Sequence, residues 1–173
     1  MPNWCFNDVE FIGSKKDIES LKELLGGEDT ESKKIFDFNK IIPMPEELRR
    51  VGNPVSIVSE EEYQKVSEKE NSIPITQTIS NEYKKKYGFD NWYDWACGTW
   101  GTKWEACEAE CINESETSLQ YNFSTAWCPP RGIFLALKKM CPKVAISWGY
   151  EERGCSLYGT WHYNGGQRKI KSK

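Results

Sequence analysis

Five stretches of the chain have the pattern expected of β-strands. In the first three, apolar and polar positions alternate, so that every second side chain falls on the same face, as in a strand with one buried side. The second and third are separated by a polar turn at residues 113–118 and predict an antiparallel hairpin. The five predicted strands are residues 4–12, 104–112, 119–127, 143–150 and 156–163.

Two further stretches repeat apolar residues at the spacing of an α-helix. The first follows Ser14, a typical N-cap residue, and ends at a pair of glycines, which adopt positive φ easily. The second follows Pro129 and Pro130, because a missing N–H costs little at a helix entrance, and it ends before Pro142. The apolar stripes are Ile18, Leu21, Leu24 and Leu25 in the first helix and Ile133, Phe134, Leu137 and Met140 in the second.

The chain between the first helix and the second strand is polar and charged. Residues 28–50 predict an acidic loop, an extended stretch held by two prolines, and a helical turn at 46–50. Residues 51–87 have few apolar anchors and predict an insertion with exposed helices in the segments EEEYQKVSEKE and TISNEYKKKYG. At the other end of the chain, the basic residues 166–173 predict a flexible tail.

The order of the regular elements is β, α, β, β, α, β, with one further strand at the C-terminal end. This order is typical of the split βαβ, or ferredoxin-like, arrangement. Right-handed crossovers place both helices on one face of an antiparallel sheet. We therefore expect an α+β protein with a single ferredoxin-like domain over residues 1–173, because a chain of this length normally forms one core.

Tryptophans are concentrated in the segment NWYDWACGTWGTKW, at residues 91–104. Rings of this size either close the core of a small domain or present an adhesive face to a partner. We expect the cluster to be mainly core. Trp4, Trp104 and Trp127 in particular are predicted to be buried, because they begin or end strands at positions of regular inward parity.

The charge of the chain is slightly negative and unevenly distributed. Residues 1–90 hold 13 Lys and Arg against 18 Asp and Glu, a net charge of −5, whereas residues 91–173 hold 10 against 8, a net charge of +2. Their sum is the −3 of the whole chain. Neither value approaches the basic balance of a protein that grips duplex DNA mainly through its phosphates.

The location of the protein is indicated by three negative features of the sequence. No apolar run approaches the roughly 20 residues that span a bilayer, and the N-terminal MPNWCFNDVE lacks the two regions of a signal peptide. The seven cysteines form an odd set without a CxxC pair, which favours reduced thiols over a secreted disulfide framework. We expect a cytoplasmic protein with no membrane contact.

Five blocks of sequence, in this order, resemble the YubB-type ferredoxin-like domain family. They are NWCFNDVEFIG, FDFNKIIPMPEEL, WYDWACGTWGTKWEA, FSTAWCPP and YEERG. The resemblance covers nearly the whole chain except residues 51–87 and the basic tail. It implies a ferredoxin-like fold and a setting on plasmids, phages or prophages. Because the family is described as having unknown function, the resemblance implies no site residues.

No complete catalytic or metal-binding constellation is visible in the sequence. The one histidine, His162, lies within a predicted strand. On a strand, Cys107 and Cys111 would be about 13 Å apart, too far to share a zinc ion by themselves. The glycines of GTWGTKW lack the spacing of a phosphate-binding loop. We therefore predict no cofactor, no metal and no enzymatic activity.

These observations favour a non-enzymatic protein of a mobile element that binds a host protein or a defence complex, for example CRISPR–Cas, as an inhibitor. Single-stranded nucleic acid or nucleotide binding on the aromatic face of the sheet is the alternative, and an enzyme of unrecognised type is a further one. The oligomeric state is left open. The candidate partner-binding residues are Glu60, Glu61, Glu62, Glu108, Glu110 and Trp100.

Overall fold

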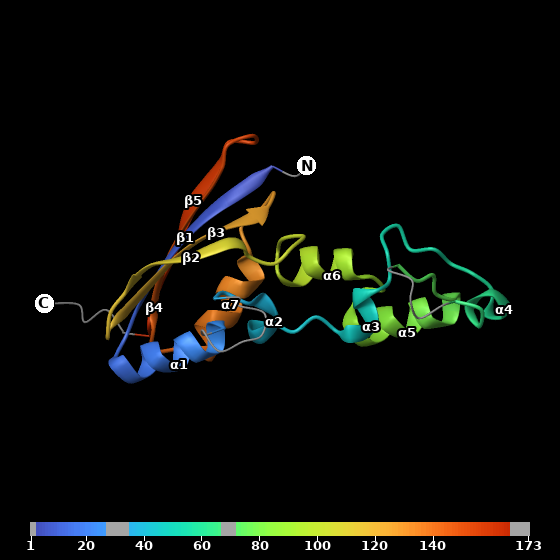
Figure 1. Ribbon diagram of the computed structural model, residues 1–173, viewed down its shortest axis with the longest axis horizontal. Coiled ribbons are helices and arrows are strands. Elements are labelled where there is room, and N and C mark those ends of the chain that lie inside the picture. Colours follow the sequence, from blue (N-terminus) through green and yellow to red (C-terminus); the bar gives the residue numbers. More distant parts are fainter. Residues whose placement is uncertain (1–2, 27–34, 67–71, 167–173) are drawn as a thin grey trace, which may run out of the picture.

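Five strands form one antiparallel sheet in the order β2-β3-β1-β4-β5 (Figure 1). The structure is a computed structural model that describes residues 3–26, 35–66 and 72–166. The strands are β1 (Trp4–Ile12), β2 (Cys107–Glu114), β3 (Ser118–Ala126), β4 (Ala145–Glu152) and β5 (Leu157–Asn164). The predicted ferredoxin-like fold, its β2–β3 hairpin and its additional C-terminal strand are therefore confirmed.

Two long helices cover one face of this sheet, as expected. Helix α1 (Lys15–Leu25) begins at Ser14, whose side chain accepts a hydrogen bond from the backbone N–H of Asp17. Helix α7 (Arg131–Met140) follows Pro130, and the short helix α2 (Phe38–Ile41) lies beside it on the same side of the sheet (Figure 1). The apolar stripes of both long helices point into the core, where Leu21, Leu25, Ile133 and Leu137 are fully buried. Met140, predicted to belong to the second stripe, is instead 47% exposed, because it is the last residue of α7.

Aromatic rings fill the space between the helices and the sheet. The ring of Phe36 is 4.8 Å from that of Phe123 and 6.2 Å from that of Trp148, measured between centroids. The indole N–H of Trp148 donates to Asn7 Oδ1 at 3.1 Å, and Asn7 Nδ2 donates to Thr125 Oγ1 at 3.0 Å. The core beneath the helices thus includes a buried amide, Asn7, whose hydrogen bonds are made within the protein.

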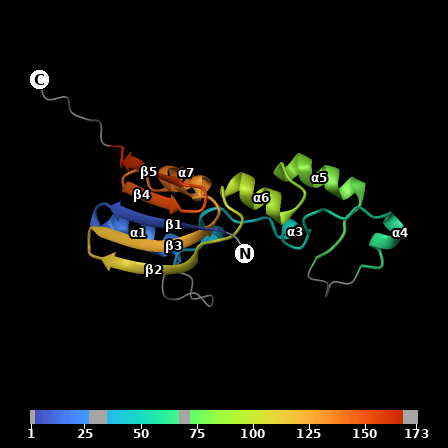
Figure 2. The ribbon, with the colours of Figure 1, turned by 90° about the horizontal axis from the view of Figure 1, so that it is seen from above.

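The remaining helices form a second unit, here called the helical lobe, that extends away from the sheet (Figure 1, Figure 2). It comprises α3 (Glu46–Arg49), α4 (Glu60–Tyr63), α5 (Gln77–Tyr87) and α6 (Trp92–Thr99). The predicted helical turn at 46–50 and the predicted helix within TISNEYKKKYG are confirmed. Helix α6 is an element that the sequence pattern did not predict, because its residues were expected to lead directly into a strand.

The helical lobe has buried contacts of its own. Val51 and Ile75 are fully buried although they lie in the polar stretch that was expected to have few anchors. Two short parallel bridges, Val51 to Ile73 and Ile57 to Ile75, join the segment before α4 to the segment before α5. Helix α4 is a single helical turn. Parts of the predicted acidic loop, of the predicted helix in EEEYQKVSEKE and of the predicted tail fall in residues 27–34, 67–71 and 167–173, which lie outside the described residues.

Burial of the tryptophans differs from the prediction. Trp95, Trp100 and Trp148 are buried, whereas Trp4 and Trp104 are only half-buried and Trp127 is 39% exposed. Trp4 points to the face of the sheet opposite the helices, in phase with the exposed Phe6. Trp127 follows the last residue of β3 with φ of 67°, so it has already left the alternation on which the prediction relied.

The second face of the sheet is not covered by any described helix (Figure 1). It will be called the open face. It carries the outward residues of β1, which include Phe6 and Asp8, and their neighbours on the other strands. Within the described ranges, no helix has both the length and the apolar character needed to cross a membrane.

Candidate binding groove

A groove of about 630 Å³ runs across the open face and is lined by residues from all five strands. Four of its lining residues are carboxylates that come from three different strands. They are Asp8 on β1, Glu108 and Glu110 on β2, and Glu151 on β4. Two exposed aromatic residues, Phe6 at 52% and Tyr158 at 76%, provide apolar surface in the same groove.

The strand register explains how these residues meet. Asp8 is paired with Gly149 on β4, and Phe6 is paired with Glu151. Residues paired directly across antiparallel strands point to the same face, with Cβ atoms about 4.5–5.5 Å apart. Gly149 has no side chain, and a Cβ added there would meet only the Asp8 carbonyl oxygen, at 3.9 Å. The glycine therefore leaves the middle of the groove open.

An irregularity in β2 brings two of its three glutamates, Glu108 and Glu110, to the groove. Cys107 is paired with Ser124 and Glu110 with Asn122, so three steps along β2 match two along β3. Glu108 has φ of 52°, which is uncommon for a residue with a side chain. A bulge of this kind redirects side chains. Here it places Glu110 on the open face beside Asn122 and leaves Glu108 lining the same groove.

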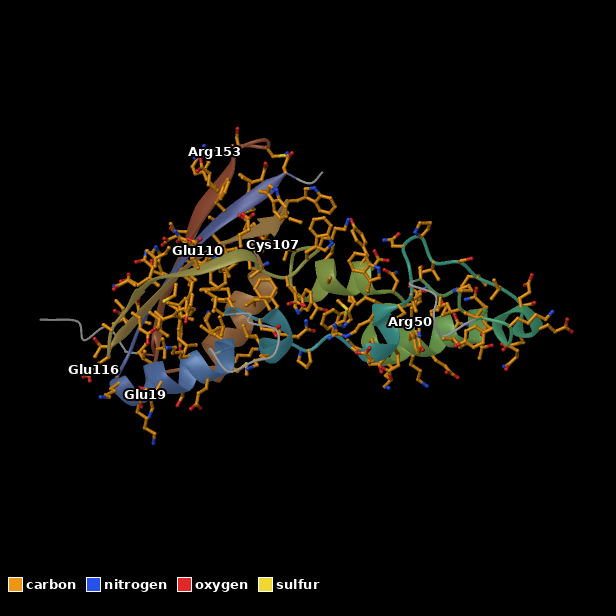
Figure 3. The ribbon with its side chains drawn as sticks, in the orientation of Figure 1. Glu19, Arg50, Cys107, Glu110, Glu116 and Arg153 are labelled. Carbon is orange, nitrogen blue, oxygen red and sulfur yellow. The ribbon has the colours of Figure 1, made fainter. Side chains whose placement is uncertain are left out.

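The groove is an acidic surface with little neutralisation. The Asp8 carboxylate accepts a hydrogen bond from Gln120 Nε2 at 3.0 Å. Glu151 is 3.4 Å from Arg153 Nε, and the Arg153 guanidinium also lies 5.9 Å from the centroid of the Phe6 ring. Among the described residues, no lysine or arginine forms a salt bridge with Asp8, Glu108 or Glu110. Figure 3 shows Glu110 on the sheet and Arg153 at the end of the β4–β5 hairpin.

The turn that carries Arg153 is held by the neighbouring carboxylate of Glu152. The Glu152 side chain is buried, and its carboxylate accepts hydrogen bonds from the backbone N–H groups of Cys155 at 2.6 Å and Gly154 at 2.8 Å. Burial alone would raise the pKa of Glu152, but these hydrogen bonds outweigh it and lower the pKa. Glu152 therefore stays ionised and keeps the turn ordered at the end of the groove.

The predicted partner-binding residues are divided by the structure. Glu108 and Glu110 lie together on the groove. Glu60, Glu61 and Glu62 lie on α4 in the helical lobe, far from the sheet (Figure 1). Glu62 has a local role, because its carboxylate accepts hydrogen bonds from the backbone N–H and the hydroxyl of Ser59, and these bonds lower its pKa.

Trp100 was wrongly expected to be a contact residue. It is 2% exposed, and its indole N–H donates to the Ile42 carbonyl oxygen at 2.9 Å. Its ring packs against those of Trp95 and Phe38. Trp100 thus joins the segment after α2 to the end of α6 and takes no part in an exposed surface.

Sequence reasoning did not identify Phe6, Asp8, Glu151 or Tyr158 as site residues. The signal for the first two was present in the alternation of residues 4–12, which puts Phe6 and Asp8 on one face. The alternation does not say which face the helices cover. Glu151 and Tyr158 join the groove only through the pairing of β4 with β1 and β5, which connects residues far apart in the sequence.

Among the residues that the structure describes, no metal-binding cluster accompanies the groove. In the part of the chain that the structure describes, no group of three or more His, Cys, Asp and Glu side chains is arranged to hold a metal ion. Burial raises the pKa of the Cys5 thiol to about 11, and the hydrogen bond and charge of Glu152 raise the pKa of the Cys155 thiol. Both thiols are therefore protonated and weakly nucleophilic near neutral pH.

Comparison with known proteins agrees with the fold. Residues 99–171 match a family model described as the ferredoxin-like domain in Api92-like protein. The crystal structure of the protein Api92 from Yersinia pseudotuberculosis is similar, with a TM-score of 0.55 and 12% identity over 95% of each chain. No curated protein matches the sequence. At this level of identity, the similarity supports the architecture and carries no assignment of activity.

Proposed function

We propose that this chain is a non-enzymatic binding protein whose groove takes a positively charged segment of a host protein. The observation that carries the proposal is the convergence of Asp8, Glu108, Glu110 and Glu151 on one open groove. Carboxylates gathered on a surface repel phosphates and attract cationic side chains, and they accelerate association with a basic partner. Phe6 and Tyr158 add the exposed aromatic area that typically anchors such a contact.

The class of partner is inferred from the acidic groove together with the phage or plasmid origin that the family resemblance implies. The sequence blocks that resemble the YubB-type family favour a phage or plasmid protein that acts in the cytoplasm of its host. A defence complex such as CRISPR–Cas handles nucleic acid in basic channels, and an acidic surface can occupy a channel of that kind. We therefore propose an anti-defence inhibitor that competes with nucleic acid.

The decisive experiment compares groove variants with a matched control. Tagged wild-type protein, a Glu108→Lys/Glu110→Lys variant and a Glu19→Lys/Glu23→Lys variant are used to recover proteins from host cells. Glu19 and Glu23 are exposed on α1, and this helix lies on the opposite side of the sheet from the groove (Figure 1), so the control makes the same charge change elsewhere. We expect a host protein that the groove variant loses and the control retains.

Binding is then measured with the purified partner. Reversal of the two groove charges should lower the association rate at least tenfold at low salt and less at high salt, because screening weakens steering. Gly149→Leu should also weaken binding, since a Cβ there has only an ordinary contact with the Asp8 carbonyl oxygen, at 3.9 Å, and a larger side chain would occupy the groove. Micromolar or tighter binding of a single-stranded oligonucleotide near 150 mM salt, with a steep salt dependence, would instead support the nucleic-acid alternative.

A further inference from the structure

Four aromatic rings surround the ammonium group of Lys103 at the junction between the helical lobe and the sheet. Lys103 Nζ is 4.5 Å from the ring centroid of Trp104, 5.3 Å from Trp127, 5.7 Å from Tyr93 and 6.0 Å from Trp92. Ring centroids within about 6 Å of a cation attract it through their negative faces. These four residues form the aromatic cage.

The rings of the aromatic cage come from three separate segments. Trp92 and Tyr93 lie in the first turn of α6, Trp104 lies in the loop before β2, and Trp127 follows β3. Neighbouring rings hold one another, since Tyr93 is 6.4 Å from Trp127 and Trp104 is 6.0 Å from Trp4 between centroids. The fold therefore brings these rings together from separate segments, and the ring of Trp4, which is outside the cage, packs against that of Trp104.

Trp127 is held in an unfavourable backbone conformation within this cage. Its φ of 67° is rare for a bulky residue, and such strain is found most often at ligand-binding positions. Its ring is also 39% exposed, so the cage opens to solvent. A tryptophan that served only to fill the core could occupy a strand position with ordinary extended backbone, which carries no such strain.

The chemistry of the cage does not match a lysine side chain well. A lysine ammonium has three N–H donors. Among the described residues, no oxygen accepts a hydrogen bond from Lys103 Nζ and no carboxylate pairs with it. A quaternary ammonium group has the same charge, no N–H donors and weaker hydration, so rings alone satisfy it.

We propose that the aromatic cage is a binding site for a methylated ammonium group and that Lys103 occupies it in the absence of that ligand. Lys103 lies in the loop between α6 and β2, and its long side chain leaves the cage by rotation of its own bonds. The neighbouring Thr102 is fixed by a hydrogen bond to the Ala126 carbonyl oxygen at 2.8 Å. Exchange of the cation therefore needs no movement of the backbone. The site is independent of the acidic groove and of the function proposed for it.

The test uses choline and its neutral carbon isostere, 3,3-dimethylbutan-1-ol, in titrations followed by tryptophan fluorescence and calorimetry. Lys103→Met removes the competing charge and keeps a flexible apolar side chain. This variant should bind choline about tenfold or more tightly than the wild type does, and should bind the neutral isostere at least tenfold more weakly than choline. Equal binding of the two compounds, or no saturable binding by Lys103→Met, would overturn the proposal.

Two controls complete the experiment. Trp127→Asn in the Lys103→Met background keeps a residue that tolerates positive φ and should lose choline binding while its circular dichroism stays unchanged. A peptide with trimethyl-lysine distinguishes the source of the group. Affinity at least tenfold above that of choline supports a side chain of a protein partner, and equal affinity supports a small molecule or a lipid headgroup. Binding of choline that survives the Trp127→Asn change would count against the cage.

Discussion

At the scale of single residues, three described residues other than glycine have left-handed backbone conformations, and two of them belong to the proposed binding features. Glu108 lines the groove, Trp127 belongs to the aromatic cage, and Ser156 closes the β4–β5 turn, with φ of 52°, 67° and 54°. Such conformations cost on the order of 1 kcal/mol or more for residues other than glycine. The cost at Glu108 and Trp127 supports the proposal that these two side chains take part in binding.

Variants of Glu108 test whether its backbone conformation lowers the stability of the fold while its side chain contributes to binding. Glu108→Gly should raise the free energy of unfolding by up to about 1 kcal/mol, because glycine adopts positive φ without strain. The same variant should weaken the proposed partner binding. Glu110→Gly, at a regular strand position, should lower stability by roughly 0.5–1 kcal/mol. Urea unfolding of both variants checks this, and a loss of stability in Glu108→Gly as large as in Glu110→Gly would contradict the strain argument.

A comparison of variants at Trp148 and Trp104 tests the difference between a fully buried ring and a half-buried one. Trp148→Phe should lower the free energy of unfolding by about 2–4 kcal/mol, since it leaves a cavity and removes the donor to Asn7 Oδ1. Trp104→Phe should cost about 1 kcal/mol or less, because this ring is only half-buried and a phenyl ring keeps its aromatic contacts. Thermal unfolding of the two variants gives the comparison, and similar losses would show that Trp104 also belongs to the core.

At the scale of elements, the sequence predicted all five described strands, three of them from their alternation, and both long helices that pack on the sheet. It did so because residues such as Leu21 and Phe123 must face one common core. Helix α6 was missed although Asn91 caps it by accepting from the N–H of Asp94. Aromatic residues dominate its sequence and give no amphipathic stripe. The groove depends on the bulge in β2 and on long-range strand register, and neither is encoded in a local pattern.

The contact between α3 and α5 is expected to depend on pH. Glu47 accepts hydrogen bonds from the Tyr87 hydroxyl at 2.6 Å and from Lys86 Nζ at 3.2 Å. These partners lower the pKa of Glu47 to about 2 from its ordinary value of 4.5. A carboxyl whose pKa is lower in the folded state stabilises that state above about pH 4.5, and this stabilisation is lost as the pH falls toward 2.

Hydrogen exchange of the α5 amides between pH 5 and pH 2.5 tests this contact, after correction for the intrinsic rates. Protection should decrease as the pH falls in the wild type. Tyr87→Phe removes the hydroxyl that donates to Glu47 and should move the pKa of Glu47 upward, which NMR of the carboxyl carbon measures directly. A pKa of Glu47 that stays near 4.5 in the wild type would show that the hydrogen bonds do not form in solution.

At the scale of the whole molecule, the sheet with its two long helices and the helical lobe are joined through two segments of chain. The chain leaves the sheet side after α2 and returns at the end of α6, where Trp100 closes the junction through its hydrogen bond to Ile42. The aromatic cage lies at the same junction. A ligand in the cage would therefore contact both units at once.

Limited proteolysis should distinguish the two units. Between Gly52 and Val66 most side chains are exposed and the only regular element is the single turn of α4. We expect the first cuts there, with the sheet and its helices remaining intact, because protease access requires exposed and easily distorted backbone. Mass spectrometry of the early fragments locates the cuts. A first cut within Leu119–Tyr163 would contradict the division into a stable sheet and a more accessible lobe.

The bulged strand also affects how molecules of this protein meet one another. β2 forms one edge of the sheet, and its pairing is interrupted twice, between Cys107 and Glu110 and between Cys111 and Asn113. A neighbouring copy that tried to extend the sheet along this edge would find a broken row of N–H and C=O groups flanked by acidic side chains. The irregularity that turns two glutamates toward the groove thus also protects this edge against aggregation when the protein is abundant.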